Sequence, residues 1–173
     1  MEKILVMDEH NYEDPLGEMV RISVRGIILI DGKLLMIENS LGEVKLPGGG
    51  MEFGEDDYRV LIREVKEETG YDVIPESIKP FGEIEEKRLS LHEPMIWHQT
   101  NRLYFCDVYP GQGRCEYTEN EKQQGFHQVF YTIEEALEKS GRMLGNEGRQ
   151  AWNQREYRTL LLIKDHFVPE KSS

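Results

Sequence analysis

Three glutamates lie close together in a segment whose pattern is typical of a helix. Glu67 and Glu68 follow Glu64 by three and four residues, so at about 100° per residue the three fall within roughly 100° of arc on one edge of a helix. Like charges at these spacings repel by a few tenths of a kcal/mol, and a hard divalent cation is the natural compensation. The alternative is a solvated acidic face with Arg63 and Lys66 as local partners. The residue types alone leave both interpretations open.

The residues around this cluster complete a longer pattern. From Gly49 the chain reads Gly, five residues, Glu55, seven residues, and then R-E-V-K-E-E-T-G over 63–70. This resembles the Nudix box, G-x5-E-x7-R-E-U-x-E-E-x-G-U, in which U is a bulky apolar residue, and all seven fixed positions match. The final apolar position holds Tyr71, whose ring can still be buried. Chance would produce the pattern on the order of once in ten thousand such sequences or less, which makes the motif specific.

The resemblance implies a fold, an activity and a cofactor. The fold would be α/β, the Nudix fold, with a mixed β-sheet sandwiched between α-helices over about residues 20–166. The activity would be hydrolysis of a diphosphate linkage in a nucleotide or nucleotide derivative, with Mg²⁺ or Mn²⁺ activating the attacking water. Carried over by position, the metal ligands would be Glu64, Glu67 and Glu68, with the backbone carbonyl of Gly48 or Gly49 as one more.

The resemblance also implies a supporting pair and a general base. Arg63 and Glu55 would form the pair. Eight helical residues would separate them by about 12 Å along the axis, too far to pair directly, so we expect Glu55 in the loop before the helix. The base lies within the box in some related enzymes and on a distant loop in others. Glu67 or Glu68 therefore competes for this role with Glu121, for which an ordinary surface position is the alternative.

The sequence says less about how the rest of the substrate is recognised. Arg25 and Lys45 lie on or beside predicted strands and could bind phosphate, and Trp97 could stack on a base. The simpler interpretation is a solvated charge for each cation and a core position for Trp97. Some Nudix subgroups carry a proline or tyrosine about sixteen residues past the box that indicates ADP-ribose or dinucleoside polyphosphates, and residues 86–89, E-K-R-L, show neither. We expect selectivity from the less regular segments, 90–99 and 110–124.

A helix over about residues 57–69 would carry the glutamate cluster. Asp56 can cap its N-terminus, and Gly70 can end it in the left-handed conformation. Apolar residues at positions 58, 61, 62 and 65 recur at helical spacing and would pack on a sheet. The proline and three glycines of 46–50 should interrupt regular structure before the helix.

Sheet-forming segments dominate the rest of the chain. Asp31-Gly32 is a strong hairpin signal between strands at 20–30 and 33–38, which would form an antiparallel pair. Further strands are predicted at 4–7, 81–88, 97–109 and 126–131, and further helices at about 132–139 and 150–167. We expect a single domain over 1–173, with a disordered tail at 169–173.

Composition limits the class of protein and its partners. The 173 residues include 33 acidic and 21 basic side chains, a formal charge of −12, which disfavours binding to nucleic acid or to an anionic membrane. The N-terminal residues lack a secretory signal and the two cysteines form no metal motif, so we expect a cytoplasmic protein. The expected partner is the small-molecule substrate. The oligomeric state stays open, with a homodimer as one option.

Two other functions share the implied fold. A non-catalytic ligand-sensing or protein-interaction module is one alternative, but the complete set of carboxylates argues against a loss of turnover. Isopentenyl diphosphate isomerase is the other, and it uses a catalytic cysteine in a strand motif that is not found around Cys106 or Cys115. Metal-dependent hydrolysis of a nucleotide would distinguish the predicted enzyme from a binding module.

Overall fold

The computed structural model describes residues 1–145 and 150–167. These residues form two compact units. Unit 1 consists of 1–28 and 47–115, and unit 2 consists of 29–46 and the described residues from 116 onward. The single domain over 1–173 stays a prediction, and the expected disordered tail at 169–173 lies outside the described residues.

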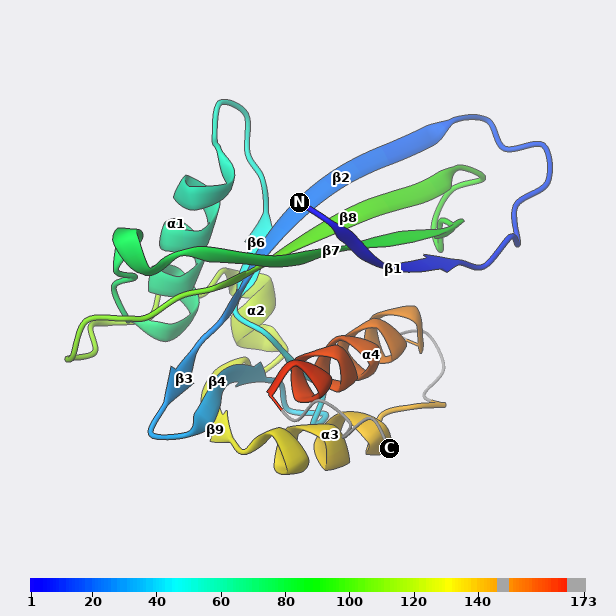
Figure 1. Ribbon diagram of the computed structural model, residues 1–173. Coiled ribbons are helices and arrows are strands. Elements are labelled where there is room, and N and C mark those ends of the chain that lie inside the picture. Colours follow the sequence, from blue (N-terminus) through cyan, green and yellow to red (C-terminus); the bar gives the residue numbers. More distant parts are fainter. Residues whose placement is uncertain (146–149, 168–173) are drawn as a thin grey trace. The chain divides into compact units, whose positions relative to one another are not determined.

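Unit 1 is built on a five-stranded sheet and an α-helix (Figure 1). Its elements are β1 (Lys3–Asp8), β2 (Glu18–Ile27), β6 (Gly48–Gly50), α1 (Asp57–Thr69), a 3-10 turn (Pro75–Ser77), β7 (Lys79–Leu89) and β8 (Ile96–Phe105). The strand order is β1-β7-β8-β2-β6. Strands β1 and β7, and β2 and β8, pair in parallel, whereas β7 with β8 and β2 with β6 are antiparallel. The sheet is therefore mixed, and α1 packs beside β6 and β2.

Helix α1 begins and ends at the predicted residues. The side chain of Asp56 accepts a hydrogen bond from a backbone N–H of the first turn, and Gly70 adopts the left-handed conformation, with φ 76°, that closes the last turn. The predicted buried face is partly wrong. Val60 is fully buried, whereas Tyr58 in the first turn is 45% exposed. The ring of Tyr58 makes an edge-to-face contact with Tyr104, with ring centroids 5.9 Å apart.

The glycine segment differs from the prediction. Gly48–Gly50 forms strand β6 instead of an irregular loop, because its backbone pairs with Ser23, Val24 and Arg25 of β2. Gly48 has φ 147°, and a Cβ there would overlap the carbonyl of Val24. The glycines therefore allow a close approach of two backbones instead of ending regular structure.

Unit 2 combines a four-stranded sheet with helices. Its described elements are β3 (Leu29–Ile30), β4 (Lys33–Glu38), β5 (Val44–Lys45), α2 (Glu119–Gln123), β9 (His127–Tyr131), α3 (Ile133–Arg142) and α4 (Gln150–Phe167). Strand β4 pairs antiparallel with β3, β5 and β9. Helices α3 and α4 pack on each other. In the described part of the chain, no helix is long and apolar enough to cross a membrane.

The hairpin at Asp31-Gly32 is confirmed, but its first strand is short. The predicted strand 20–30 divides into β2 and β3, and only β3 pairs with β4. Strand β2 instead runs parallel to β8, a partner that local alternation cannot reveal. The capping box of α3 at Thr132 is confirmed. Helix α2 lies inside the predicted loop 110–124, and its five residues are too few to show helical periodicity.

Candidate active site

The three clustered glutamates lie on α1, beside the glycine strand β6. Glu68 is only 3% exposed, and its Oε2 accepts a hydrogen bond from the backbone N–H of Gly48 at 2.9 Å. The side chain of Glu64 is 14% exposed and that of Glu67 is 39% exposed. A Cβ at Gly49 would overlap the Glu64 carboxylate. Only glycine at this position lets the carboxylate lie directly against the strand.

Arg63 offsets part of the negative charge in this cluster. Its Nε and Nη2 donate to the two oxygens of Glu55 at 2.7 and 2.9 Å, a bidentate pair. Its Nη1 donates to Glu64 Oε1 at 2.8 Å and lies 3.6 Å from Glu67 Oε2. Its Nη2 also donates to the carbonyl of Gly50 at 3.3 Å. Glu55 lies before α1, as expected, so the loop reaches back to anchor the arginine.

The electrostatics of the cluster show an excess of negative charge. Burial of the Glu64 carboxyl, followed by the negative charge of Glu68, raises the pKa of Glu64 although Arg63 opposes the shift. Hydrogen bonds from Arg63 lower the pKa of Glu55 to about 2. Of the interactions that stabilise the charged Arg63 guanidinium, the hydrogen bonds to Glu55 are the strongest. A divalent cation would compensate the charge that remains at Glu64 and Glu68.

The donor atoms of the cluster fit Mg²⁺ or Mn²⁺, which prefer carboxylate and carbonyl oxygens. Within residues 1–145 and 150–167, no three His, Cys, Asp or Glu side chains already form a metal-binding group. The hydrogen bonds explain this, because Glu64 turns toward Arg63 and Glu68 toward the Gly48 N–H. A cation would therefore have to replace these hydrogen bonds with metal–oxygen bonds.

The carbonyls of Gly48 and Gly49, the two candidates for an additional metal ligand, point in opposite directions. Pro47 and Met51 make backbone hydrogen bonds to β2. The Gly48 N–H and the Gly50 carbonyl instead bond to side chains of α1. Because backbone groups alternate in direction along a strand, the Gly48 carbonyl lies on the α1 side and the Gly49 carbonyl on the β2 side. Gly48 is therefore the better candidate.

The other predicted site residues have different surroundings. Arg25 lies opposite Gly48 in β2 and is 7% exposed, so the simpler interpretation of a solvated surface charge is wrong. Lys45 belongs to unit 2, where its ammonium lies 5.0 Å from the centre of the Phe126 ring. Glu121 also belongs to unit 2 and accepts a hydrogen bond from the backbone N–H of its own helix cap at 2.8 Å. The box itself belongs entirely to unit 1.

Trp97 lies near the start of β8 and is partly exposed, not buried in the core. The guanidinium carbons of Arg21 and Arg88 lie 5.9 and 5.6 Å from its ring centre. Arg21 was not among the predicted candidates, since the box motif does not include it. The available signal was the alternation of polar residues at 21, 23 and 25 within a predicted strand, which indicates that one face of that strand is polar.

A buried polar network was also missed. Ser23 Oγ donates to Asn101 Oδ1 at 2.6 Å, and Gln99 Nε2 donates to the same oxygen at 2.7 Å. All three residues are at most 5% exposed. Asn101 Nδ2 has no hydrogen-bond partner among the described residues. Buried polar groups on neighbouring strands are costly unless paired, so this face of the sheet is built for more than apolar packing.

Cysteine chemistry is absent from this site. Cys106 is 4% exposed, and burial raises the pKa of its thiol to about 12. The thiolate is the reactive form, so this thiol is a poor nucleophile at neutral pH. Cys106 and Cys115 are both free. Cys106 therefore does not suit the role of the catalytic cysteine in the isomerase alternative.

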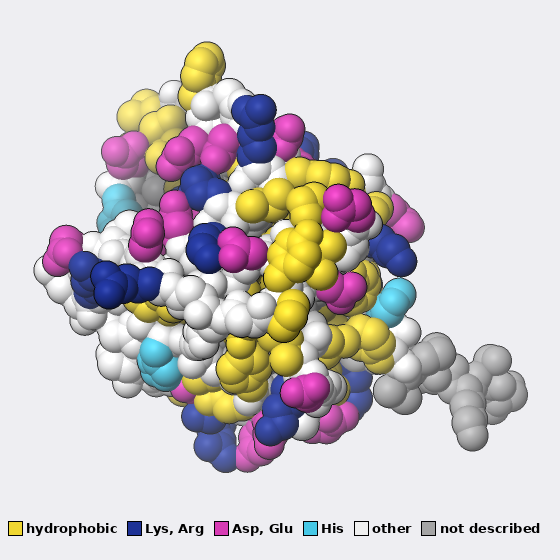
Figure 2. All heavy atoms as spheres, turned by 90° about the vertical axis from the view of Figure 1, so that its left-hand side faces the viewer, with side chains coloured by type: hydrophobic (Ala, Val, Ile, Leu, Met, Phe, Trp, Pro, Cys, Tyr) yellow, Lys and Arg dark blue, Asp and Glu magenta, His cyan; other side chains and the backbone are white. Residues whose placement is uncertain are grey.

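Charge is mixed on the face of the molecule seen in Figure 2. Acidic and basic side chains are interspersed there, and hydrophobic side chains gather near the centre. The expected lack of a nucleic-acid or membrane partner rests on net charge and stays a prediction.

Comparison with known proteins places this geometry in a family. A model of the NUDIX domain matches residues 19–147. The protein named "Putative ADP-ribose pyrophosphatase YjhB" of Bacillus subtilis (strain 168) is 28% identical over 106 residues, which are 61% of this chain and 47% of that protein. The ADP-ribose pyrophosphatase of Methanocaldococcus jannaschii is 43% identical over 53 residues, 28% of this chain and 31% of that protein. The chain thus matches less than half the length of either curated relative.

The fold agrees with this assignment. The solved structure of a NUDIX hydrolase from Nitrosomonas europaea aligns with a TM-score of 0.58 at 19% identity, covering 88% of this chain and 92% of that one. This likeness confirms the expected α/β Nudix fold. All fixed positions of the box are present. With the family model covering well over half of its residues, the chain belongs to the NUDIX domain family.

Proposed function

We propose that this protein hydrolyses a diphosphate linkage in a nucleotide or nucleotide derivative and uses Mg²⁺ or Mn²⁺ as its cofactor. The observation that carries the proposal is the position of Glu64 and Glu68 against the glycine strand, with more negative charge than Arg63 offsets. Such a buried excess of charge lowers stability. A bound divalent cation would compensate this charge.

The residues of the box and the preceding Gly48 divide three tasks in this proposal. A bound divalent cation supplies a Lewis acid for the diphosphate and lowers the pKa of a coordinated water. Glu64, Glu68 and the Gly48 carbonyl would hold the cation, and Glu67 stays a candidate for a further ligand or for the general base. Arg63 orients Glu64, and Glu55 in turn holds Arg63 through two hydrogen bonds.

Glu67 is the candidate for the group that takes the proton from the attacking water. Its side chain is 39% exposed, against 14% for Glu64, so water reaches it more readily. Glu68 is buried and already accepts the Gly48 N–H. Glu121 is the remaining alternative, but its carboxylate is occupied by the cap of α2.

ADP-ribose is the first substrate to test, because two curated relatives are named as enzymes or candidate enzymes for it. The sequence 86–89 lacks the proline or tyrosine that marks some Nudix subgroups, so the panel must be wider. Other nucleoside diphosphate sugars, dinucleoside polyphosphates and nucleoside triphosphates complete it.

The test uses purified protein with each substrate in Mg²⁺, in Mn²⁺ or in excess chelator. The expected result is release of a nucleoside monophosphate only when a cation is present. Reaction in ¹⁸O-labelled water should place the label in a phosphate product, as attack of water on phosphorus requires. Binding without hydrolysis of any substrate would contradict the proposal and support a non-catalytic module.

A further inference from the structure

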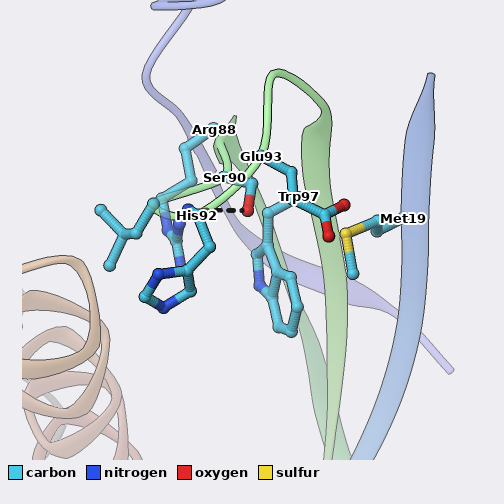
Figure 3. A pocket seen from close by; sticks show the side chains of 7 residues that line it. Met19, Arg88, Ser90, His92, Glu93 and Trp97 are labelled. Carbon is cyan, nitrogen blue, oxygen red and sulfur yellow. Dashed lines mark hydrogen bonds between the residues drawn. The ribbon is translucent and has the colours of Figure 1, made fainter. Parts of the chain in front are cut away.

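A pocket with a volume of about 280 Å³ lies where β7 and β8 connect, within unit 1 (Figure 3). The rings of Trp97 and His92 form part of its wall, and Met19 and Leu91 add apolar surface. Leu91 is 66% exposed and Met19 is 37% exposed, so the pocket opens to solvent. The carboxylate of Glu93 adds an acceptor of hydrogen bonds. Aromatic walls with a few polar groups are typical of sites for flat organic ligands.

The indole of Trp97 is held in place by neighbouring charges. Arg21 and Arg88 both make cation–π contacts with it. Arg88 is itself fixed, because its Nε donates to Glu86 Oε1 at 3.0 Å and Glu86 is 2% exposed. A ring that is ordered before a ligand arrives loses little conformational entropy on binding.

Arg21 and Trp97 share one face of the sheet, and this is the face opposite to α1, because Arg102 and Tyr104 of β8 point the other way and hydrogen-bond Asp57 of α1. The hydrogen bond between Ser23 and Asn101 shows that these residues of β2 and β8 lie on the same face. Side chains alternate along each strand, so Arg21 and Trp97 project from that face as well. Arg21 also lies against β6, since its Nη2 is 2.9 Å from the position that a Cβ on Gly50 would take. One guanidinium therefore reaches both the glycine strand and the indole.

The distance between the two regions suits a nucleotide. Gly50 pairs with Ser23 and Trp97 pairs with Met19, so the two rows are about 13 Å apart along β2. Strands β6 and β8 flank β2 on opposite sides, which adds about 10 Å across the sheet and gives about 16 Å in all. This span is comparable with the length of an extended nucleoside diphosphate. Because β6 is the edge strand of this sheet, a diphosphate at the box and a base at Trp97 can belong to one molecule that passes this edge.

We propose that the pocket beside Trp97 binds the base of the nucleotide substrate and that Arg21 binds the phosphate next to it. This subsite rests on the proposed function, because the box supplies the diphosphate chemistry. A base stacks on the indole since both present flat π faces. Met19 and Leu91 cover the edges of the base, and Glu93 accepts hydrogen bonds from an exocyclic amino group.

The first experiment measures binding without turnover. The chain has two tryptophans. Trp152→Phe leaves Trp97 as the only one, so that the emission comes from Trp97. In Mg²⁺, this variant is titrated with α,β-methylene-ADP, with α,β-methylene-GDP, and with methylenediphosphonate, which has no base. The nucleotide analogues should quench the emission in a saturable way, and methylenediphosphonate should leave it unchanged. An absence of quenching by both analogues, or equal quenching by all three ligands, would overturn the proposal.

The second experiment removes the stacking surface. Trp97→Leu should weaken the binding of the preferred nucleotide analogue by at least about tenfold, the range expected for loss of one base–aromatic stack. Trp97→Phe keeps an aromatic plane and should recover most of that affinity. Isothermal titration calorimetry measures the affinity of both variants for the analogue and does not depend on tryptophan emission. It therefore replaces the fluorescence assay if Trp152→Phe does not fold. An equal loss of affinity for methylenediphosphonate would show that Trp97 only supports the sheet.

These results can be separated from a failure of the proposed hydrolysis. A protein that binds the analogues at Trp97 and hydrolyses nothing contradicts the enzyme activity alone. If Trp97→Leu hydrolyses the substrate with the same KM and kcat as the unchanged chain, the result contradicts the proposed pocket but not the enzyme activity. Circular dichroism of each variant checks that the fold is retained.

Discussion

Glutamates on the helices of the two units have different surroundings. In unit 2, Glu121 and Glu135 each accept a hydrogen bond from the N-cap backbone of their own helix, at 2.8 and 2.9 Å. In unit 1, Glu68 accepts the N–H of Gly48, twenty residues away in the sequence. The first arrangement completes a helix locally, whereas the second connects a helix to a strand.

The position along the helix sharpens this difference. Glu121 and Glu135 lie in the first turn, where negative charge is stabilised by the helix dipole. Glu67 and Glu68 lie in the last turn of α1, where the same dipole disfavours them. The capping glutamates therefore stabilise the fold. At Glu67 and Glu68 the dipole instead opposes the charge, which a bound cation would compensate.

The largest effect that would test this comparison is removal of the divalent cation. Excess chelator should abolish hydrolysis, and addition of Mg²⁺ or Mn²⁺ should restore it, because no lysine or arginine in the cluster can replace a dication at Glu64 and Glu68. Activity is measured as release of nucleoside monophosphate. Undiminished turnover in chelator would instead support the alternative in which the α1 glutamates form a solvated acidic face.

Replacement of one glutamate in each unit is the next test. Glu68→Gln keeps the shape of the side chain but removes its charge, and it should lower kcat at least about a hundredfold, since a lost electrostatic contribution of about 3 kcal/mol would have that effect. Its melting temperature should not fall. Glu121→Gln is the matched control and should keep kcat within about twofold. A large loss of kcat in the control would instead favour Glu121 as the general base.

A glycine in each unit provides a third comparison. Gly49→Ala should lower kcat by about tenfold or more, because its Cβ would displace the Glu64 carboxylate. Gly141→Ala in α3 is the control, since its Cβ would meet Tyr157 only at an ordinary contact distance of 3.5 Å. Steady-state kinetics of both variants measure the effect. Equal kcat in the two would show that the approach of β6 to Glu64 is not required.

The sequence predicted the local features of the site well. The ends of α1 follow from Asp56 and Gly70, and the capping box of α3 follows from Thr132, because each depends on groups within a few residues. The place of Glu55 before the helix followed from the pair with Arg63 that the resemblance implies, together with the rise of a helix. Such features need no knowledge of the tertiary fold.

The features that were missed depend on pairing between distant segments. The glycines of β6 form a strand only because β2 provides a partner. The burial of Arg25 and the contacts of Arg21 with Gly50 and Trp97 come from the order of strands in the sheet. Local propensity does not determine that order. The motif therefore predicted the arrangement of α1 and Glu55 better than the strand pairing that places Arg21 and Trp97.

A smaller effect on stability is expected at the caps of unit 2. Thr132→Ala removes the oxygen that accepts the N–H of Glu135 at 3.2 Å, and it should lower the free energy of unfolding by about 1 kcal/mol. Thr132→Ser keeps the acceptor and serves as the control. Urea denaturation followed by circular dichroism measures both, and kcat should not change in either. If Thr132→Ala lowered kcat strongly, the division between structural and functional glutamates would be too simple.

The smallest expected effect is the acid sensitivity of the pair between Glu55 and Arg63. Hydrogen bonds from Arg63 lower the pKa of Glu55 from its ordinary value of 4.5 to about 2. A lowered pKa means that the folded state favours the charged form, so the stabilisation is complete above pH 4.5 and is lost as the pH falls toward 2. The difference in unfolding free energy between the unchanged chain and Glu55→Gln should therefore be largest near pH 6 and shrink below pH 4.5. Other carboxyl groups titrate in both proteins and cancel from the difference, so two curves that remain parallel down to pH 3 would mean that Arg63 does not stabilise the charged form of Glu55.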